Sequence, residues 1–131
     1  MIVDSSALLA ILKKEPEASK LSEAILAAES CFISSGTLLE AAIVAESHRG
    51  KSGAEDLDDL VAELELVIIP FDAEHVRLAR DAFRRYGKGQ GHAARLNFGD
   101  CFAYALAKAE GEPLLFKGRD FSETDIEAAS Y

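Results

Sequence analysis

The chain has 131 residues, of which 49% are hydrophobic, which is enough to fill one core and indicates a single domain over residues 1–131. Acidic residues outnumber basic ones 23 to 14 and give a formal net charge of −9, which excludes a general basic coat for holding nucleic acid. No apolar run approaches the ~20 residues that cross a bilayer, and the N-terminus lacks the basic lead of a signal peptide, so we expect a cytoplasmic protein without membrane contact.

In the first half of the chain, apolar runs typical of strands alternate with stretches whose apolar residues recur every three or four positions, as in helices. The predicted elements are a strand over residues 1–3, helices over 5–14 and 16–29, a strand over 31–34 and a long helix from Gly36 to Gly50. Pro16 suits the first turn of its helix, and Gly50 suits a helix end. The order is strand then helix, twice.

The second half continues the alternation. The predicted elements are an amphipathic helix over residues 54–66, a strand over 66–69, a helix capped by Asp72 and ending at Tyr86, a helix over 100–110 and a strand over 113–116. A glycine-rich basic loop, GKGQGHAARLN, lies before the helix that starts at Asp100. The strands are apolar on both faces, which predicts an α/β fold whose parallel sheet is covered by helices on both sides.

In such a sheet the ligand crevice lies at the carboxyl ends of the strands, so acids placed there are candidates for chemistry. Asp4 follows the first strand, and Asp100 begins a helix after the basic loop. Each also has an ordinary explanation, because Asp caps helices well and is favourable in their first turn. Neither residue is decisive by itself.

Glu40 is harder to explain structurally, because it lies in LLEAAIVA with apolar residues on nearly every side of the helix. A buried carboxylate is costly unless it is paired with a cation, and no Lys or Arg is close in sequence. Asp120 follows the last strand and is either a turn residue or a further site acid, with Asp125 as a weaker candidate for the same role. Lys117 is the only basic residue placed to neutralise such a cluster.

Carboxylates gathered from separate segments raise one another's pKa or demand a cation. Oxygen ligands without sulfur or imidazole select hard ions, so we expect Mg²⁺ or Mn²⁺ as cofactor and hydrolysis of phosphodiesters as the reaction. The three histidines show no paired spacing that would indicate zinc, and the two cysteines, in apolar surroundings, indicate reduced buried thiols.

The segments MIVDSSALLAIL, LLEAAIVAE, NFGDCFAYALA and PLLFKGRDF resemble, in order, the PIN-domain ribonucleases and specifically the VapC toxins of bacterial toxin–antitoxin pairs. The resemblance implies a three-layer α/β/α fold around a mostly parallel sheet of four to five strands. It implies that Asp4, Glu40 and Asp100 surround Mg²⁺ or Mn²⁺ and that Ser6 helps to order the site. It assigns the fourth acid to Asp120 less securely, because many relatives place it two positions earlier, where this chain has Gly118.

The resemblance also implies partners: a homodimer, a VapB-type antitoxin near the acidic site, and structured RNA such as transfer RNA as substrate. The basic loop offers phosphate contacts through Lys88, His92 and Arg95, although it could equally be an ordinary solvated loop. The apolar first helix leaves room for a dimer or antitoxin contact besides its role in the core.

Two other classes of function compete. A phospho-acceptor receiver domain has the same alternating architecture, but it needs adjacent acids after the first strand, where this chain has serines, and only Asp72 could serve as acceptor. A PIN-like fold that has lost catalysis and acts as a binding module for RNA or protein is the other. Metal-dependent cleavage of RNA by the purified chain separates this module from an enzyme.

Overall fold

The computed structural model describes all 131 residues and is built on four short strands. These are β1 (Ile2–Val3), β2 (Phe32–Ser34), β3 (Val67–Ile69) and β4 (Leu114–Leu115). They form one sheet in the order β3-β2-β1-β4, and every neighbouring pair is parallel. The predicted parallel sheet is confirmed, with four strands and with β1 in an inner position.

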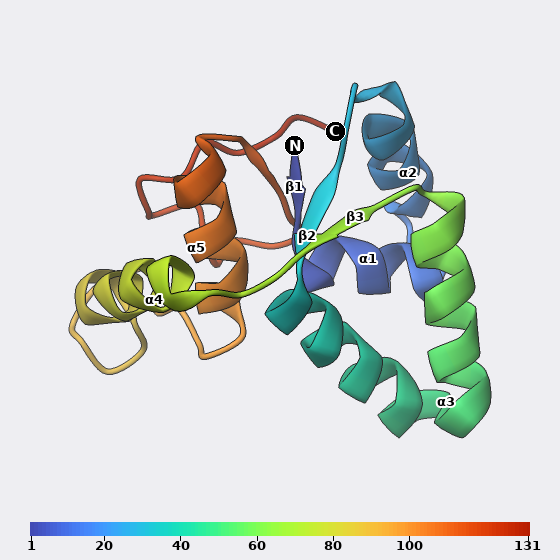
Figure 1. Cartoon of the computed structure of the whole chain (residues 1–131), viewed down its shortest axis with the longest axis horizontal. Coiled ribbons are helices and arrows are strands. Elements are labelled where there is room, and N and C mark those ends of the chain that lie inside the picture. Colours follow the sequence, from blue (N-terminus) through green and yellow to red (C-terminus); the bar gives the residue numbers. More distant parts are fainter.

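Helices cover the sheet on both faces (Figure 1). Their bounds are α1 (Ser5–Leu12), α2 (Ala18–Ala27), α3 (Ser35–Glu63), α4 (Ala73–Tyr86) and α5 (Asp100–Glu110). In Figure 1, α4 and α5 lie on one side of the strands, and α1, α2 and α3 lie on the other. The expected three-layer α/β/α architecture is confirmed.

Two apolar cores, one on each face of the sheet, follow from the alternation of side chains along the strands. Val3 and Leu115 belong to the core with α1, α2 and α3, whereas Ile2 and Leu114 belong to the core with α4 and α5. Consecutive residues of β1 and β4 therefore serve opposite layers. This explains why these strands have no polar face.

Tight turns place the helix starts at the carboxyl edge of the sheet. Asp4 follows β1 directly and caps α1, and Ser34 ends β2 and caps α3. The backbone N–H of Asp4 also donates to the carbonyl of Leu115, which fixes Asp4 beside the end of β4. Side chains from the first turns of α1 and α3 therefore share one edge of the sheet.

One detail of the predicted helices is wrong. Pro16 does not lie in a helix, because α2 begins at Ala18 and Glu17 is its N-cap. The helix break predicted at Gly50 is confirmed, because α3 consists of two helices that meet at a kink where Arg49 and Gly50 have non-helical angles. Gly50 has φ of 60°, a conformation that favours glycine, so the predicted break exists but is only two residues long. None of the helices combines the length and apolar character needed to cross a membrane.

Candidate active site

Asp4 is the most deeply buried acid at the carboxyl edge of the sheet, with 3% of its surface exposed. Its Oδ2 accepts hydrogen bonds from the backbone N–H of Ser6 at 3.0 Å and from the Ser6 hydroxyl at 2.6 Å. Its Oδ1 is buried and has no hydrogen-bond partner. Burial raises the pKa of Asp4 to about 6, although the bonds from Ser6 oppose this change. A buried carboxylate oxygen without a donor is a ligand atom available to a cation.

Ser6 connects Asp4 to the segment that follows β4. Its hydroxyl donates to Asp4 and accepts the backbone N–H of Lys117 at 2.9 Å. The direction of both hydrogen bonds is therefore fixed, and Ser6 holds the Asp4 carboxylate in one orientation. The ammonium group of Lys117 forms ion pairs with Glu15 and Glu17 instead of the site acids. The sequence had indicated Lys117 as the one basic residue placed to neutralise the site acids.

Asp100 is the first residue of α5 and is 7% exposed. Its Oδ2 accepts the backbone N–H of Asn97, and the Asn97 side-chain carbonyl accepts the N–H of Asp100, both at 2.9 Å. Burial raises the pKa of Asp100 to about 7, and the negative charges of Asp4, Asp120 and Glu40 add to this effect. Three acids from separate segments thus act electrostatically on Asp100.

Glu40 lies in the second turn of α3 and is only partly buried, which corrects the expectation of a buried helical position. Its neighbour Leu39 is 61% exposed, so the apolar sequence around Glu40 is not entirely core. Its partner is the hydroxyl of Ser5, which donates to Oε1, and no Lys or Arg is paired with it. Its other oxygen, Oε2, faces Gly99, directly before Asp100.

Ser5 and Gly99 are the site residues that sequence reasoning missed. The available signals were a second hydroxyl beside Ser6 and a glycine immediately before a candidate acid. Neither signal indicates a contact with Glu40, because these contacts join segments that are distant in sequence.

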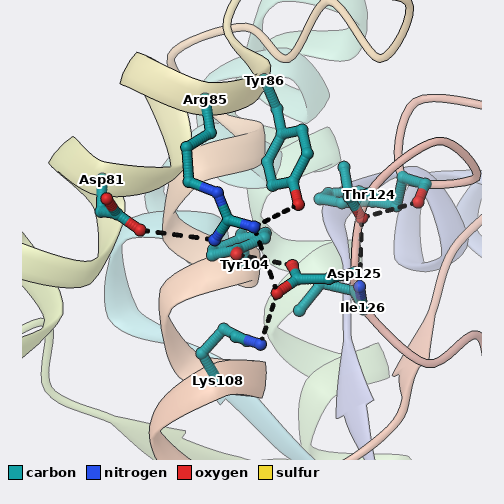
Figure 2. A network of polar contacts seen from close by, with 9 residues as sticks. Asp81, Arg85, Tyr86, Tyr104, Lys108, Thr124, Asp125 and Ile126 are labelled. Atoms are coloured by element: carbon teal, nitrogen blue, oxygen red, sulfur yellow. Dashed lines mark hydrogen bonds and ion pairs between the residues drawn. The ribbon is translucent and has the colours of Figure 1, made fainter.

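Asp120 and Asp125 have different surroundings. Asp120 is exposed and contributes to the raised pKa of Asp100. Asp125 accepts a hydrogen bond from the Tyr104 hydroxyl at 2.7 Å and pairs with Lys108 at 2.8 Å and with Arg85 at 3.7 Å (Figure 2). Burial opposes its charge, but the bonds from Lys108 and Tyr104 prevail and lower the pKa of Asp125. Asp125 is therefore engaged in a structural network with Tyr104, Lys108 and Arg85.

The position two residues before Asp120 is unsuited to an acid in this chain. Gly118 has φ of 99°, a conformation that side chains other than glycine rarely adopt. An Asp at this position would be strained. The exposed Asp120 therefore stays a candidate for the fourth acid, whereas an acid at position 118 is disfavoured.

The acids do not form a preorganised metal-binding site. No group of three or more Asp, Glu, His or Cys side chains is positioned to enclose one ion. The donor set is nevertheless all oxygen, because the thiols of both free cysteines are buried and donate to backbone carbonyls, Cys31 to Ile25 and Cys101 to Asn97. The residues present fit a hard divalent ion that keeps part of its water shell.

Residues of the basic loop lie beside the acids. Lys88 and Arg95 line a shallow hollow that also includes Arg119 and Asp120. His92 has structural contacts: its Nδ1 accepts the backbone N–H of Ala94 at 3.0 Å, and its ring packs edge-to-face on Tyr86. Lys88 and Arg95 therefore have side chains available close to Asp120, while His92 is engaged within the loop.

Comparison with known proteins identifies the family of the chain. The PIN domain family matches residues 1–127 of the chain. A ribonuclease VapC of Mycolicibacterium smegmatis is 47% identical over 128 residues, 98% of each chain. Ribonuclease VapC28 of Mycobacterium tuberculosis is 44% identical over 129 residues, 98% of this chain and 97% of that one. The chain therefore belongs to the PIN-domain family and, within it, to the VapC ribonucleases.

Solved structures show the same fold at low sequence identity. VapC20 of Mycobacterium tuberculosis, described as a sarcin–ricin loop cleaving toxin, has a TM-score of 0.77 at 14% identity, covering 95% of each chain. VapBC2 of Rickettsia felis, bound to a DNA fragment from its promoter, gives 0.76 at 17% identity, covering 97% of this chain and 94% of that one. Membership of this family excludes the receiver-domain alternative.

Proposed function

We propose that this chain acts as one PIN unit over residues 1–131, a divalent-metal-dependent endoribonuclease toxin that uses Mg²⁺ or Mn²⁺. Asp4 and Asp100 hold the ion directly, and Glu40 and Asp120 complete the acidic wall around it. The unpartnered Oδ1 of Asp4, buried among acids that raise the pKa of Asp100, is the observation that carries this proposal. The raised pKa values describe carboxylates that a bound cation would stabilise.

A bound Mg²⁺ supplies Lewis acidity toward the phosphate and lowers the pKa of a coordinated water. The chain's own residues position the reactants. Ser6 fixes the rotamer of Asp4, and Asn97 fixes Asp100 at the start of α5. Glu40 is held by Ser5 and is open enough to accept a hydrogen bond, and then the proton, from the attacking water.

Substrate and partners are proposed from the relatives. We take structured RNA, such as transfer RNA, as the substrate, since a structural neighbour is described as cleaving the sarcin–ricin loop. We take a VapB-type antitoxin as the partner that covers the acidic site, since another neighbour was solved as a VapBC assembly. We also propose that two copies of this chain form a homodimer.

Lys88 and Arg95, near Asp120, are the residues that we propose contact phosphates of the RNA substrate, and His92 supports their loop.

The test is to incubate the purified chain with total RNA and Mg²⁺ and to sequence the new ends. We expect discrete cleavage sites that vanish in EDTA and in the Asp4→Asn and Asp100→Asn variants. Activity that survives both substitutions would overturn the site. A chain that binds RNA without cutting it would be a binding module.

The basic loop has a separate test. Charge reversal of Lys88 and Arg95 to Glu should weaken RNA binding while Mg²⁺ affinity stays at the parental value. Lys51→Glu, on α3, is the matched control, because its side chain is 91% exposed. Unchanged RNA affinity in the double variant would remove the loop from the proposal.

A further inference from the structure

Two side-chain contacts connect α1 with the part of α3 that precedes its kink. At the sheet, the Ser5 hydroxyl donates to Glu40, and further along both helices the Lys13 ammonium lies 3.4 Å from Nε2 of His48. The residues of both pairs are 35 positions apart in sequence, so the two helices keep the same register. Figure 1 shows α1 and α3 leaving the strands on the same side.

These contacts are the two ends of one seam between the helices. Leu9 on α1 and Val44 on α3 lie midway in sequence between the ends, and both are half-buried. Eight residues of helix rise about 12 Å, so the Lys13–His48 pair lies roughly this far from the Glu40 end of the seam. The seam therefore leads from the candidate active site to a basic pair.

A hollow of about 370 Å³ opens at this far end, where α1 stops and α3 bends at Gly50. Its lining is mainly polar and includes four basic side chains from two segments of the chain: Lys13, Lys14, His48 and Arg49. All four of these residues are exposed. The hollow is therefore open to a ligand from solvent.

The charges of the lining do not cancel. Asp56 is its one acid, and Asp56 forms an ion pair with Arg49. Lys13 and Lys14 form no salt bridge, and the two glutamates that follow them in the sequence pair with Lys117 instead. In a chain of net charge −9, two ammonium groups without an acidic partner favour an anionic ligand.

Two other charged residues lie near the hollow in sequence without changing this balance. Glu46 precedes His48 by two residues, and positions two apart on a helix do not face the same way. Lys51, beyond the kink, pairs with Glu55, and neither residue belongs to the lining.

The contact between Lys13 and His48 shows which anion fits. An ammonium has only donors, so His48 must be neutral for its Nε2 to accept. A phosphate between the two groups would remove this restriction, because its oxygens accept hydrogen bonds from the ammonium and from the imidazole together. Lys14 offers a further donor in the same lining.

RNA presents such a phosphate at every nucleotide. Charges along one strand are about 3.4 Å apart in a helix and further apart when the strand is extended, so ~12 Å corresponds to roughly two to four nucleotides. A strand whose scissile bond lies at the acids can therefore place a second phosphate at the far end of the seam. This step rests on the proposed RNA substrate.

We propose that the hollow formed by Lys13, Lys14 and His48 binds a backbone phosphate of the RNA substrate, roughly two to four nucleotides from the cleaved bond. A phosphate contact fixes the position of a strand without reading its sequence. The hollow therefore adds affinity and register to the site and leaves the choice of bases to other residues.

The experiment measures, by anisotropy in EDTA, the binding of a short, unstructured, fluorescein-labelled RNA of mixed sequence. Lys13→Gln combined with Lys14→Gln should weaken binding about 2- to 30-fold, the range for loss of two exposed ion pairs. The slope of log affinity against log salt should fall by about 0.7 per lost phosphate contact. Lys20→Gln, at an exposed and unpaired lysine of α2, is the matched control and should keep the parental slope.

Single-turnover cleavage of the same RNA in Mg²⁺ gives a second measurement. The double variant should need a higher protein concentration for half-maximal rate, by the factor seen in the binding curves. Its rate at saturation should equal that of the parent, because the hollow lies away from the acids. A lower rate at saturation with parental affinity would contradict a role in binding.

Parental affinity and salt slope in the double variant would overturn the proposal. So would tight binding of a fluorescein-labelled oligoglutamate peptide that needs both lysines and that RNA does not displace, because the hollow would then hold an acidic protein segment. A parent that cleaves RNA while the double variant binds it normally overturns the hollow alone. A parent that neither binds nor cleaves RNA overturns the proposed function as well.

Discussion

Gly99 lies directly against the carboxylate of Glu40, so closely that a Cβ on Gly99 would come within 1.3 Å of Oε2. The backbone of Gly99 has φ of −63° and ψ of −38°, which any residue can adopt. Conformational freedom is therefore not the reason for a glycine at this position. The reason is space for the Glu40 carboxylate beside the start of α5.

Gly99→Ala should therefore displace Glu40 without disturbing the helix. We expect the rate of RNA cleavage to fall by up to about 100-fold, the scale of a catalytic group moved by about 1 Å, with little change in the melting temperature. In a Glu40→Asp background, Gly99→Ala should lower the cleavage rate less than it does in the parent, because the shorter acid leaves room for the methyl group. A fully active Gly99→Ala variant would show that the position of Glu40 does not matter.

The hydrogen bond from Ser5 to Glu40 can be tested with a double-mutant cycle. Ser5→Ala removes the donor that orients Glu40, and a lost hydrogen bond to a charged group predicts about a tenfold decrease in cleavage rate. In a Glu40→Ala background the same change should have almost no effect, since both substitutions break one link. Strictly additive losses in this double-mutant cycle would contradict a positioning role for Ser5.

The raised pKa values of Asp4 and Asp100 predict how stability depends on pH without metal. Both acids have an ordinary pKa of 3.8 and folded values of about 6 and about 7, so the folded state binds more protons than the unfolded chain in this window. Stability therefore falls as pH rises from about 4 to about 7. Asp4→Asn keeps the N-cap and removes the charge, so it should exceed the parent by about 1–3 kcal/mol in unfolding free energy at pH 8. If the unfolding free energies of the parent and of Asp4→Asn, measured in EDTA, changed with pH in the same way, this prediction would be refuted.

Mg²⁺ should reverse the loss of stability that ionisation of Asp4 and Asp100 causes. At pH 8 a saturating concentration, about 100 times Kd, should stabilise the parent by about 2.7 kcal/mol, seen as a higher melting temperature. Asp4→Asn and Asp100→Asn should lose this increment. Removal of the ion with EDTA should restore the lower value, and an increment that persists in both variants would place the ion elsewhere.

The choice between Asp120 and Asp125 is open to a paired comparison. Asp125→Ala leaves the 1% exposed Tyr104 without its acceptor and should cost about 1–2 kcal/mol of stability, yet its Mg²⁺ increment should match the parent. Asp120→Ala should barely change stability, because the residue is exposed, and should weaken Mg²⁺ binding. The opposite pattern would make Asp125 the fourth acid.

Most of the fold could be predicted from local chemistry. Apolar runs mark the strands, Asp4 and Asp72 cap the helices that follow them, and Gly111 ends α5 in a left-handed conformation. The errors occurred where tertiary packing decides. Pro16 suits a first helical turn, but the chain makes a turn there and the helix starts at Ala18.

The acids were also predictable, because the ends of parallel strands meet at one edge of a sheet. The contacts of these acids could not be predicted. Glu40 meets Ser5 across 35 residues, and Lys117 pairs with Glu15 across 102, so only the folded chain shows which groups are neighbours. The apolar sequence around Glu40 indicated burial, yet that face of α3 is partly open. Asp125 is engaged by Tyr104 and Lys108, residues of α5 whose approach no local pattern indicates.

The most direct test of the account is the anomalous diffraction of Mn²⁺ in crystals of the active chain, compared with crystals of Asp100→Asn. The account predicts a Mn²⁺ peak in direct contact with the carboxylates of Asp4 and Asp100 in the parent, and its loss in the variant. A fully active parent whose only Mn²⁺ peaks lie away from Asp4 and Asp100 would contradict it.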